Sequence, residues 1–310
     1  MLIQSLIFLI LGFVLLVKGA DWFVDSAVAI ARKFSIPELV IGLTIVAMGT
    51  SMPEAAVSIN AALNGNAGIA IGNVCGSNIM NILVVLGLTA IVATIPVQKS
   101  TVKTEIPFLL VISLFVLIFG KNSETISRIE GAILWGCFIL YLTHLFRISK
   151  NKETGTEEKD PKIDRPVWQC IGILIITGIM IVKGSDLIVS GASNIASLIG
   201  LSDRIIGLTV VAFGTSLPEL VTCITAATKG KTDLAIGNIV GSNIFNILFV
   251  LGTTAVIAPV PFETKFVVDA AVGIFAAFVL WLGVFRKNQL GRAAGIIMLG
   301  IYAVYFVQLL

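Results

Sequence analysis

The sequence predicts an all-α polytopic membrane protein with ten transmembrane helices, arranged as two inverted five-helix repeats with broken helices at the midplane. The first observation is composition: 57% of the 310 residues are hydrophobic and 13% are charged, whereas soluble domains carry about 25% charged residues. The second observation is an internal duplication. Residues 41–54 recur at 206–219 with 11 of 14 positions identical, and residues 71–83 recur at 236–248 with 10 of 13 identical. Both copies are offset by 165 residues, which indicates a duplicated membrane protein.

Ten apolar segments predict helices that cross a hydrocarbon core of ~30 Å. They lie at 2–31, 37–63, 67–95, 106–120, 131–147, 167–199, 203–228, 232–258, 266–285 and 290–310. Each half holds five spans, an odd number, so the second half must enter the membrane upside down relative to the first. We therefore expect a first transmembrane repeat at 1–147, a linker at 148–166 and a second, inverted repeat at 167–310.

The basic residues predict the orientation of these spans. Loops on the side reached by the first span hold 15 of the 21 Lys and Arg residues, and loops on the other side hold four. Short loops rich in Lys and Arg stay in the cytoplasm. We therefore expect a multi-pass protein of the cell membrane, with the 148–166 linker cytoplasmic and both termini extracellular. No basic segment precedes the first span, so a cleaved signal peptide is not expected.

Each repeat places one glutamate, Glu54 or Glu219, deep in an apolar run. An ionisable side chain at that depth is costly, so it indicates a functional site. Pro53 lacks a backbone N–H and its ring crowds the carbonyl of Gly49, which predicts a helix break near 47–53 and its counterpart near 212–218. A break frees carbonyl oxygens, which membranes tolerate where they face protein or a polar cavity.

Helical spacing gathers further oxygen ligands around the two glutamates. Residues three or four apart share a helix face, so the first repeat presents Thr50, Ser51 and Glu54 together, and Ser77 with Asn81. The second repeat presents Thr215, Ser216, Glu219, Ser242 and Asn246. Such a cluster of oxygens without sulfur or imidazole suits hard cations, and a flexible site with many oxygens suits Ca²⁺ better than Mg²⁺. The same oxygens could instead hold Na⁺.

Some of these residues are open to a purely structural interpretation. Glycine- and serine-rich membrane helices often reflect close packing, but two in-register copies, each with a glutamate after a proline, argue against packing alone. Asn81 and Asn246 could make interhelical hydrogen bonds instead of binding ions, and Asn73 and Asn238 fit such bonding better. The cysteines lie in apolar stretches without metal-ligand spacing, so we expect reduced packing residues at Cys75, Cys137, Cys170 and Cys223.

Two repeated pairs of charges predict local contacts outside the cluster. Lys18 with Asp21, and Lys183 with Asp186, are spaced three apart and fit intrahelical ion pairs near the membrane interface. The first and sixth spans also carry small residues along their surfaces, such as Gly19 and Gly184. Small residues let a helix pass close to its neighbours. We expect these two helices to move as a pair against a fixed ion-binding core.

The motifs G-T-S-x-P-E and G-S-N-x-x-N resemble the α-repeats of the Ca²⁺/cation antiporter superfamily. They look most like the sodium/calcium exchanger branch, in its prokaryotic form without regulatory domains, and the resemblance covers both halves. It implies ten helices, with ions held among the second, third, seventh and eighth. The implied site residues are Thr50, Ser51, Glu54, Ser77, Asn81, Thr215, Ser216, Glu219, Ser242 and Asn246, together with the backbone carbonyls of Ala47 and Ala212.

The resemblance implies a secondary active antiporter that exchanges Ca²⁺ for Na⁺ by alternating access. H⁺/Ca²⁺ exchange is the alternative, because Glu54 and Glu219 can bind protons when the site is empty. Potassium-dependent members, and some prokaryotic ones, carry Asp where this chain has Asn246, which argues against K⁺ co-transport. A cation channel is a more distant alternative. The sequence shows no nucleophile–base pair, so we expect no enzyme and no cofactor. The expected partners are the bilayer and the transported cations, without nucleic acid; the oligomeric state is not predicted.

Overall fold

The computed structural model describes residues 2–151, 166–199 and 212–309. These residues form helices joined by short loops and four two-residue strands. The first half contains α1 (Leu2–Lys33), α2 (Glu38–Ile41), η1 (Gly42–Val46), α3 (Ala47–Thr50), α4 (Met52–Leu63), α5 (Gly68–Met80), η2 (Asn81–Leu86), α6 (Gly87–Val92), β1 (Ile95–Pro96), η3 (Thr101–Glu105), α7 (Ile106–Ser123), β2 (Thr125–Ile126) and α8 (Arg128–Asn151). The η elements are π-helical segments that continue the flanking α-helices.

The described part of the second half repeats this order, except that α15 has no π-helical segment at its start. It contains α9 (Val167–Leu198), α11 (Ala212–Thr215), α12 (Leu217–Thr228), α13 (Thr232–Phe245), η5 (Asn246–Leu251), α14 (Gly252–Ile257), β3 (Val260–Pro261), α15 (Thr264–Phe285), β4 (Gln289–Leu290) and α16 (Arg292–Leu309). Most of the predicted linker, and the start of the predicted 203–228 span, lie outside the described residues.

The described residues include seven helices that are long and apolar enough to cross a membrane, or eight if the bent pair Glu38–Thr50 and Met52–Leu63 is one span. Two shorter apolar helices accompany them, Leu217–Thr228 and Arg292–Gln308. This confirms a polytopic helical membrane protein. The count of ten spans stays a prediction, because two of the ten rest on helices shorter than a full crossing.

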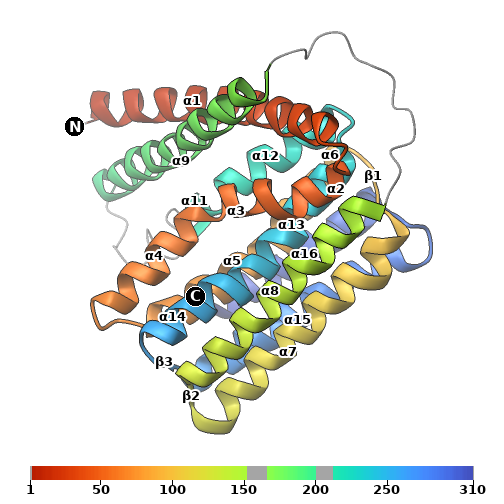
Figure 1. The fold of residues 1–310 in the computed structure, drawn as a ribbon. Helices are drawn as coiled ribbons and strands as arrows, with labels where there is room; N and C mark the ends of the chain where they lie inside the picture. Colours follow the sequence, from red (N-terminus) through yellow and green to blue (C-terminus); the bar gives the residue numbers. More distant parts are fainter. Residues whose placement is uncertain (1, 152–165, 200–211, 310) are drawn as a thin grey trace.

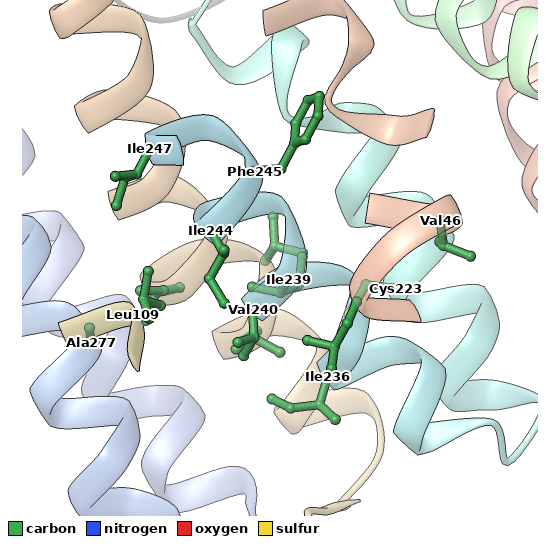
Figure 2. Packing of buried hydrophobic residues seen from close by; sticks show 14 of the residues in the cluster. Val46, Leu109, Cys223, Ile236, Ile239, Val240, Ile244, Phe245, Ile247 and Ala277 are labelled. Atoms are coloured by element: carbon green, nitrogen blue, oxygen red, sulfur yellow. The ribbon is translucent and has the colours of Figure 1, made fainter. Parts of the chain in front are cut away.

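Two helical segments form the centre of the molecule. In Thr232–Ile257, 94% of the most apolar stretch is buried inside the protein, and in Gly68–Val92 the figure is 83%, whereas it is 22–33% in the other five long helices. Figure 2 shows buried side chains leaving α13 in several directions, among them Ile236, Val240 and Ile244. The outer helices leave apolar side chains exposed, which suits a surface that faces lipid.

The predicted break in the second span is confirmed. The helix α2–η1–α3 and the helix α4 meet at an angle of 50°. Ser51, with φ −88° and ψ 10°, separates them, and Pro53 follows within the first turn of α4. In the second half, Ser216 separates α11 from α12 with φ −91° and ψ 2°, and proline again follows. Proline fits a first helical turn because the N–H it lacks has no partner there.

A glycine with positive φ follows each of the two helices that carry the glutamates, α4 and α12. Gly65 (φ 79°) follows α4 and Gly230 (φ 73°) follows α12, a conformation that glycine adopts without steric cost. The chain then reverses into α5 and α13, respectively. This short return places the two motif segments of each repeat side by side.

The fourth span is longer than the predicted 106–120, since the helix runs through η3 and α7 from Thr101 to Ser123. The predicted span began at residue 106, just after the charged residues Lys103 and Glu105. The Glu105 side chain is nevertheless buried, so the helix continues inside the protein past a charge that a hydropathy pattern treats as its end.

Helices α1 and α9 lie side by side and cross the other helices at one end of the bundle (Figure 1). Their backbones approach closely at glycines: a Cβ placed on Gly184 would lie 2.7 Å from the Leu16 nitrogen, and one placed on Gly12 would lie 2.7 Å from the Gly184 oxygen. The small residues of the first and sixth spans therefore pack against each other, so the two helices form one closely packed pair.

Short loop strands tie the two halves together. Strand β1 pairs with β4 and β2 pairs with β3, both antiparallel. Each pair joins a loop of the first half to a loop of the second. The two halves therefore contact each other through paired loop strands as well as through the packed helices of the core.

The charges on α1 make a contact that the sequence did not predict. Asp21 and Asp25 both pair with Lys229, which follows α12, at 2.7 and 2.6 Å. Lys229 also donates a hydrogen bond to the Asp21 backbone oxygen at 2.8 Å. The predicted Lys18–Asp21 pair is not among the ion pairs of the described residues, because Asp21 faces the second half. The repeated pair Lys183–Asp186 is present at 3.2 Å.

We expect Lys229→Met to lower the thermal unfolding midpoint, equivalent to about 1 kcal/mol, because it removes an ion-pair network that holds α1 to α12. Burial alone would lower the pKa of Lys229, but hydrogen bonds to Asp21 and Asp25 and their charges raise it above its ordinary value. A raised lysine pKa gives stability that is full at neutral pH and is lost as the pH rises through that pKa. Unfolding of detergent-purified protein across pH checks this. Lys183→Met, in an exposed pair, is the control and should change little.

Candidate ion-binding site

The two glutamates lie at equivalent points of the broken helices. Glu54 is in the first turn of α4 and Glu219 is in the first turn of α12. Both side chains are fully buried. The positive end of a helix dipole and unpaired backbone N–H groups favour a carboxylate in the first turn. The break therefore does two things: it ends one helix near the middle of the span, and it starts another whose first turn carries the acid.

The hydroxyls of the first repeat reach into the second. Ser51 Oγ donates a hydrogen bond to Glu219 Oε1 at 2.8 Å. Thr50 Oγ1 donates to Asn238 Oδ1 at 3.0 Å and lies 3.5 Å from Ser242 Oγ. These contacts join residues about 170 to 190 positions apart in the chain. The structure thus brings Thr50 and Ser51 of the first repeat next to Glu219 and Ser242 of the second, so this group of oxygens needs both repeats.

The Ala47 backbone oxygen belongs to the same cluster. Thr50 Oγ1 lies 3.3 Å from it and Ser242 Oγ donates to it at 3.4 Å. In the second half, Ala212 begins α11, while Thr215 ends α11 and is partly buried. Ser216 is buried at the break that follows.

The two carboxylates are neighbours. Glu54 is close enough to Glu219 for their charges to interact, and Ser77 lies beside the Glu54 carboxyl without completing a hydrogen bond to it. Two buried carboxylates repel each other when both are ionised. A divalent cation between them removes that repulsion and balances both charges.

Several oxygens of the predicted ligands have no hydrogen-bond partner among the described residues, although each is shielded from solvent. They are Oε1 and Oε2 of Glu54, Oε2 of Glu219, Oδ1 of Asn81, Oδ1 of Asn246 and Oγ of Ser216. A buried polar atom without a partner costs about 1–3 kcal/mol, and folded proteins contain few. These six oxygens belong to predicted ligands of both repeats, and a cation is a partner that such oxygens can take. Oxygen ligands of this kind suit Ca²⁺ and Na⁺.

Two residues of the G-S-N motif that were not predicted as site residues, Asn78 and Asn243, contact the predicted ligands. Asn81 donates to Asn243 Oδ1 at 3.1 Å, and Asn246 donates to Asn78 Oδ1 at 3.2 Å. Their appearance in both copies of the motif was the available signal. Asn73, expected to hydrogen-bond between helices, does so: it donates to the Glu54 backbone oxygen at 3.0 Å and to Ser58 at 2.9 Å.

The core also contains a cavity beside the asparagines that contact the predicted ligands. That cavity is lined mainly by apolar residues, together with Asn78, Asn243 and Asp269, and by none of the twelve predicted site residues. The cysteines are free, and those at 75, 170 and 223 are buried, as predicted for packing residues. The cluster itself is closed, since Glu54, Glu219, Asn81 and Asn246 are fully buried.

A family model described as sodium/calcium exchanger protein matches residues 4–147 and 170–310. The chain belongs to the sodium/calcium exchanger family. The two matched regions cover both halves of this family member and leave the linker between them. This confirms the resemblance seen in the motifs. Its family relatives are ion exchangers rather than enzymes.

Curated relatives and a solved structure agree with this membership over the full length. An uncharacterized membrane protein of Methanocaldococcus jannaschii is 38% identical, with 100% of this chain and 99% of the relative covered. The sodium/calcium exchanger MaX1 of Methanosarcina acetivorans is 31% identical, with 100% and 99% covered. The structure of the sodium-calcium exchanger NCX_Mj, soaked with 10 mM Na⁺ and zero Ca²⁺, superposes with a TM-score of 0.87 at 37% identity, covering 100% of both chains.

Proposed function

We propose that this exchanger-family protein carries Ca²⁺ out of the cell in exchange for Na⁺, by alternating access to the cluster around Glu54 and Glu219. One observation carries the proposal: two fully buried carboxylates are neighbours, and six oxygens of the predicted ligands, three of them on these carboxylates, have no partner among the described residues. Two ionised glutamates balance one Ca²⁺. The hydroxyls and amides around them can also hold Na⁺, so the two cations compete for the same oxygens.

The proposed architecture is ten spans in two inverted repeats, 1–147 and 167–310, joined by the 148–166 linker. Reciprocal contacts support it. Asn78 Nδ2 donates to the Asn243 backbone oxygen at 3.2 Å, and Asn243 Nδ2 donates to the Asn78 backbone oxygen at 3.1 Å. A contact that is returned by the equivalent residues is what a two-fold axis between repeats produces. The Lys and Arg distribution supports a cytoplasmic linker and two extracellular termini.

Alternating access needs a part that moves and a part that keeps the site intact. Helix α13, which is buried from Leu234 to Phe245, and its hydrogen bonds to α3 and α5 make up the fixed part. The α1–α9 pair crosses it at one end (Figure 1). We propose that this pair moves across the core and opens the closed cluster to one side of the membrane at a time.

We expect Ca²⁺ uptake into proteoliposomes to require an opposing Na⁺ gradient and no K⁺. The reason is that Asn81 and Asn246 both carry neutral amides, whereas a further carboxylate would be needed to balance an additional monovalent cation. The measurement is ⁴⁵Ca²⁺ uptake under separate Na⁺, H⁺ and K⁺ gradients. Equal uptake driven by a pH gradient without Na⁺ would establish H⁺/Ca²⁺ exchange instead.

The same vesicles test the channel alternative. A channel conducts without a counter-ion and gives single-channel currents, whereas an antiporter shows saturable flux that stops when Na⁺ is absent on the opposite side. Channel selectivity filters are commonly rings from several subunits, while this cluster is completed by the two halves of one chain. We therefore expect counter-ion-dependent flux.

A further inference from the structure

We infer that Asn78 and Asn243 are positioning residues that turn the amide oxygens of Asn246 and Asn81 toward the transported cation. This inference rests on the proposed function of the oxygen cluster. It concerns how the site selects cations, because an asparagine side chain has two nearly isosteric ends. Its oxygen attracts a cation, and its NH₂ group repels one.

The orientation of Asn78 is fixed by the backbone of the other repeat. Its Nδ2 donates to the Asn243 main-chain oxygen at 3.2 Å. A carbonyl oxygen accepts hydrogen bonds and does not donate them, so the NH₂ end of Asn78 must face it. The Oδ1 end then faces Asn246, which donates its own Nδ2 at 3.2 Å.

This second bond determines the orientation of Asn246. With its NH₂ group held by Asn78 Oδ1, its own oxygen points away from that bond. That oxygen is buried and has no hydrogen-bond partner in the described part of the chain. A flip of the amide would leave two oxygens facing each other at the Asn78 contact and would offer NH₂ hydrogens to the ion.

The other half repeats the arrangement with the residues exchanged. Asn243 Nδ2 donates to the Asn78 main-chain oxygen at 3.1 Å, and Asn81 Nδ2 donates to Asn243 Oδ1 at 3.1 Å. The Asn81 oxygen is again buried without a partner among the described residues. The π-helical segments η2 and η5 begin at Asn81 and Asn246, and such segments are frequent at functional sites.

The two arrangements are independent at the level of side chains. The Asn78 side chain contacts the Asn243 backbone and the Asn246 amide, and the Asn243 side chain contacts the Asn78 backbone and the Asn81 amide. Alanine at one position therefore leaves the hydrogen bonds of the other side chain in place. These hydrogen bonds pair Asn78 with Asn246, and Asn243 with Asn81, and a double-mutant cycle can detect this pairing.

The experiment measures ⁴⁵Ca²⁺ binding to detergent-purified protein by equilibrium dialysis. We expect Asn78→Ala to weaken Ca²⁺ binding roughly 10-fold to 100-fold, as removal of residues that orient metal ligands does. In an Asn246→Ala background, where both glutamates remain, adding Asn78→Ala should change binding by less than about 2-fold, because no amide is left to orient. In an Asn81→Ala background, Asn78→Ala should keep its full effect.

A general structural role would give a different pattern. If Asn78 only supported packing, its effect on Ca²⁺ binding would add fully in both backgrounds, and that result would overturn the inference. Thermal unfolding of each variant checks folding, and Thr254→Val, which removes a buried hydroxyl that bonds within its own helix, controls for the loss of a buried polar group. The Asn243/Asn81 cycle repeats the test in the other half. Wild-type protein that binds no Ca²⁺ would instead overturn the proposed function itself.

Discussion

Glu54→Gln and Glu219→Gln should each abolish Ca²⁺ transport while leaving a folded protein. Both carboxylates are fully buried and lie near each other. In either variant, one remaining carboxylate balances only one of the two positive charges of Ca²⁺. The site is shielded from water, and an uncompensated charge there costs several kcal/mol. Glutamine keeps the shape and one oxygen, so folding is spared. The effect should therefore appear in transport, measured as ⁴⁵Ca²⁺ uptake into proteoliposomes, and not in the thermal unfolding midpoint.

Glu263→Gln provides the matched control, because it removes the same charge from an exposed glutamate that pairs with Lys265 outside the cluster. It should transport normally. The two glutamates differ in their surroundings. Glu219 accepts a hydrogen bond from Ser51, whereas neither Glu54 oxygen has a partner among the described residues. Near-normal Ca²⁺ flux in either site variant would show that the cluster does not bind the transported ion.

A disulfide between α9 and the core should stop exchange, and reduction should restore it. A Cβ built on Gly214 lies 3.4 Å from the Val189 Cβ, close to the ~3.8 Å separation found in disulfides. Val189→Cys with Gly214→Cys, in a background without the native cysteines, therefore links the proposed moving pair to α11, which leads through Ser216 into the helix that carries Glu219. ⁴⁵Ca²⁺ uptake is measured before and after reduction of the same sample, which separates the crosslink from the substitutions.

A second disulfide tests whether α1 and α9 move as one body. A Cβ built on Gly19 lies 3.2 Å from the Met180 Cβ, so Gly19→Cys with Met180→Cys joins α1 to α9 and leaves the core free. This crosslinked protein should keep exchanging ions. If it stops as the α9–core crosslink does, the two helices must move relative to each other. If verified α9–core crosslinks leave transport intact, the moving-pair proposal fails.

The amino-acid sequence by itself determined the membrane character, the duplicated motifs, the helix breaks and the two central glutamates. Each of these follows from short-range chemistry. Apolar composition forces helices, and a proline at position 53 or 218 cannot continue the hydrogen-bond pattern of the preceding turn. A glutamate after that proline in both copies stands out against its apolar neighbours. Because both motifs recur at the same 165-residue offset, the motif in each half supports the interpretation of its copy in the other half.

The tertiary structure alone decided which residues meet across the halves. Spacing along one helix places Ser51 beside Glu54, but the hydrogen bond of Ser51 goes to Glu219 in the other repeat. Likewise, Asp21 pairs with Lys229 and not with Lys18. Asn78 and Asn243 gained a role because each reaches the backbone of the opposite helix. Periodicity reports the face on which a side chain lies and not the partner opposite that face, since the partner depends on how the two halves pack.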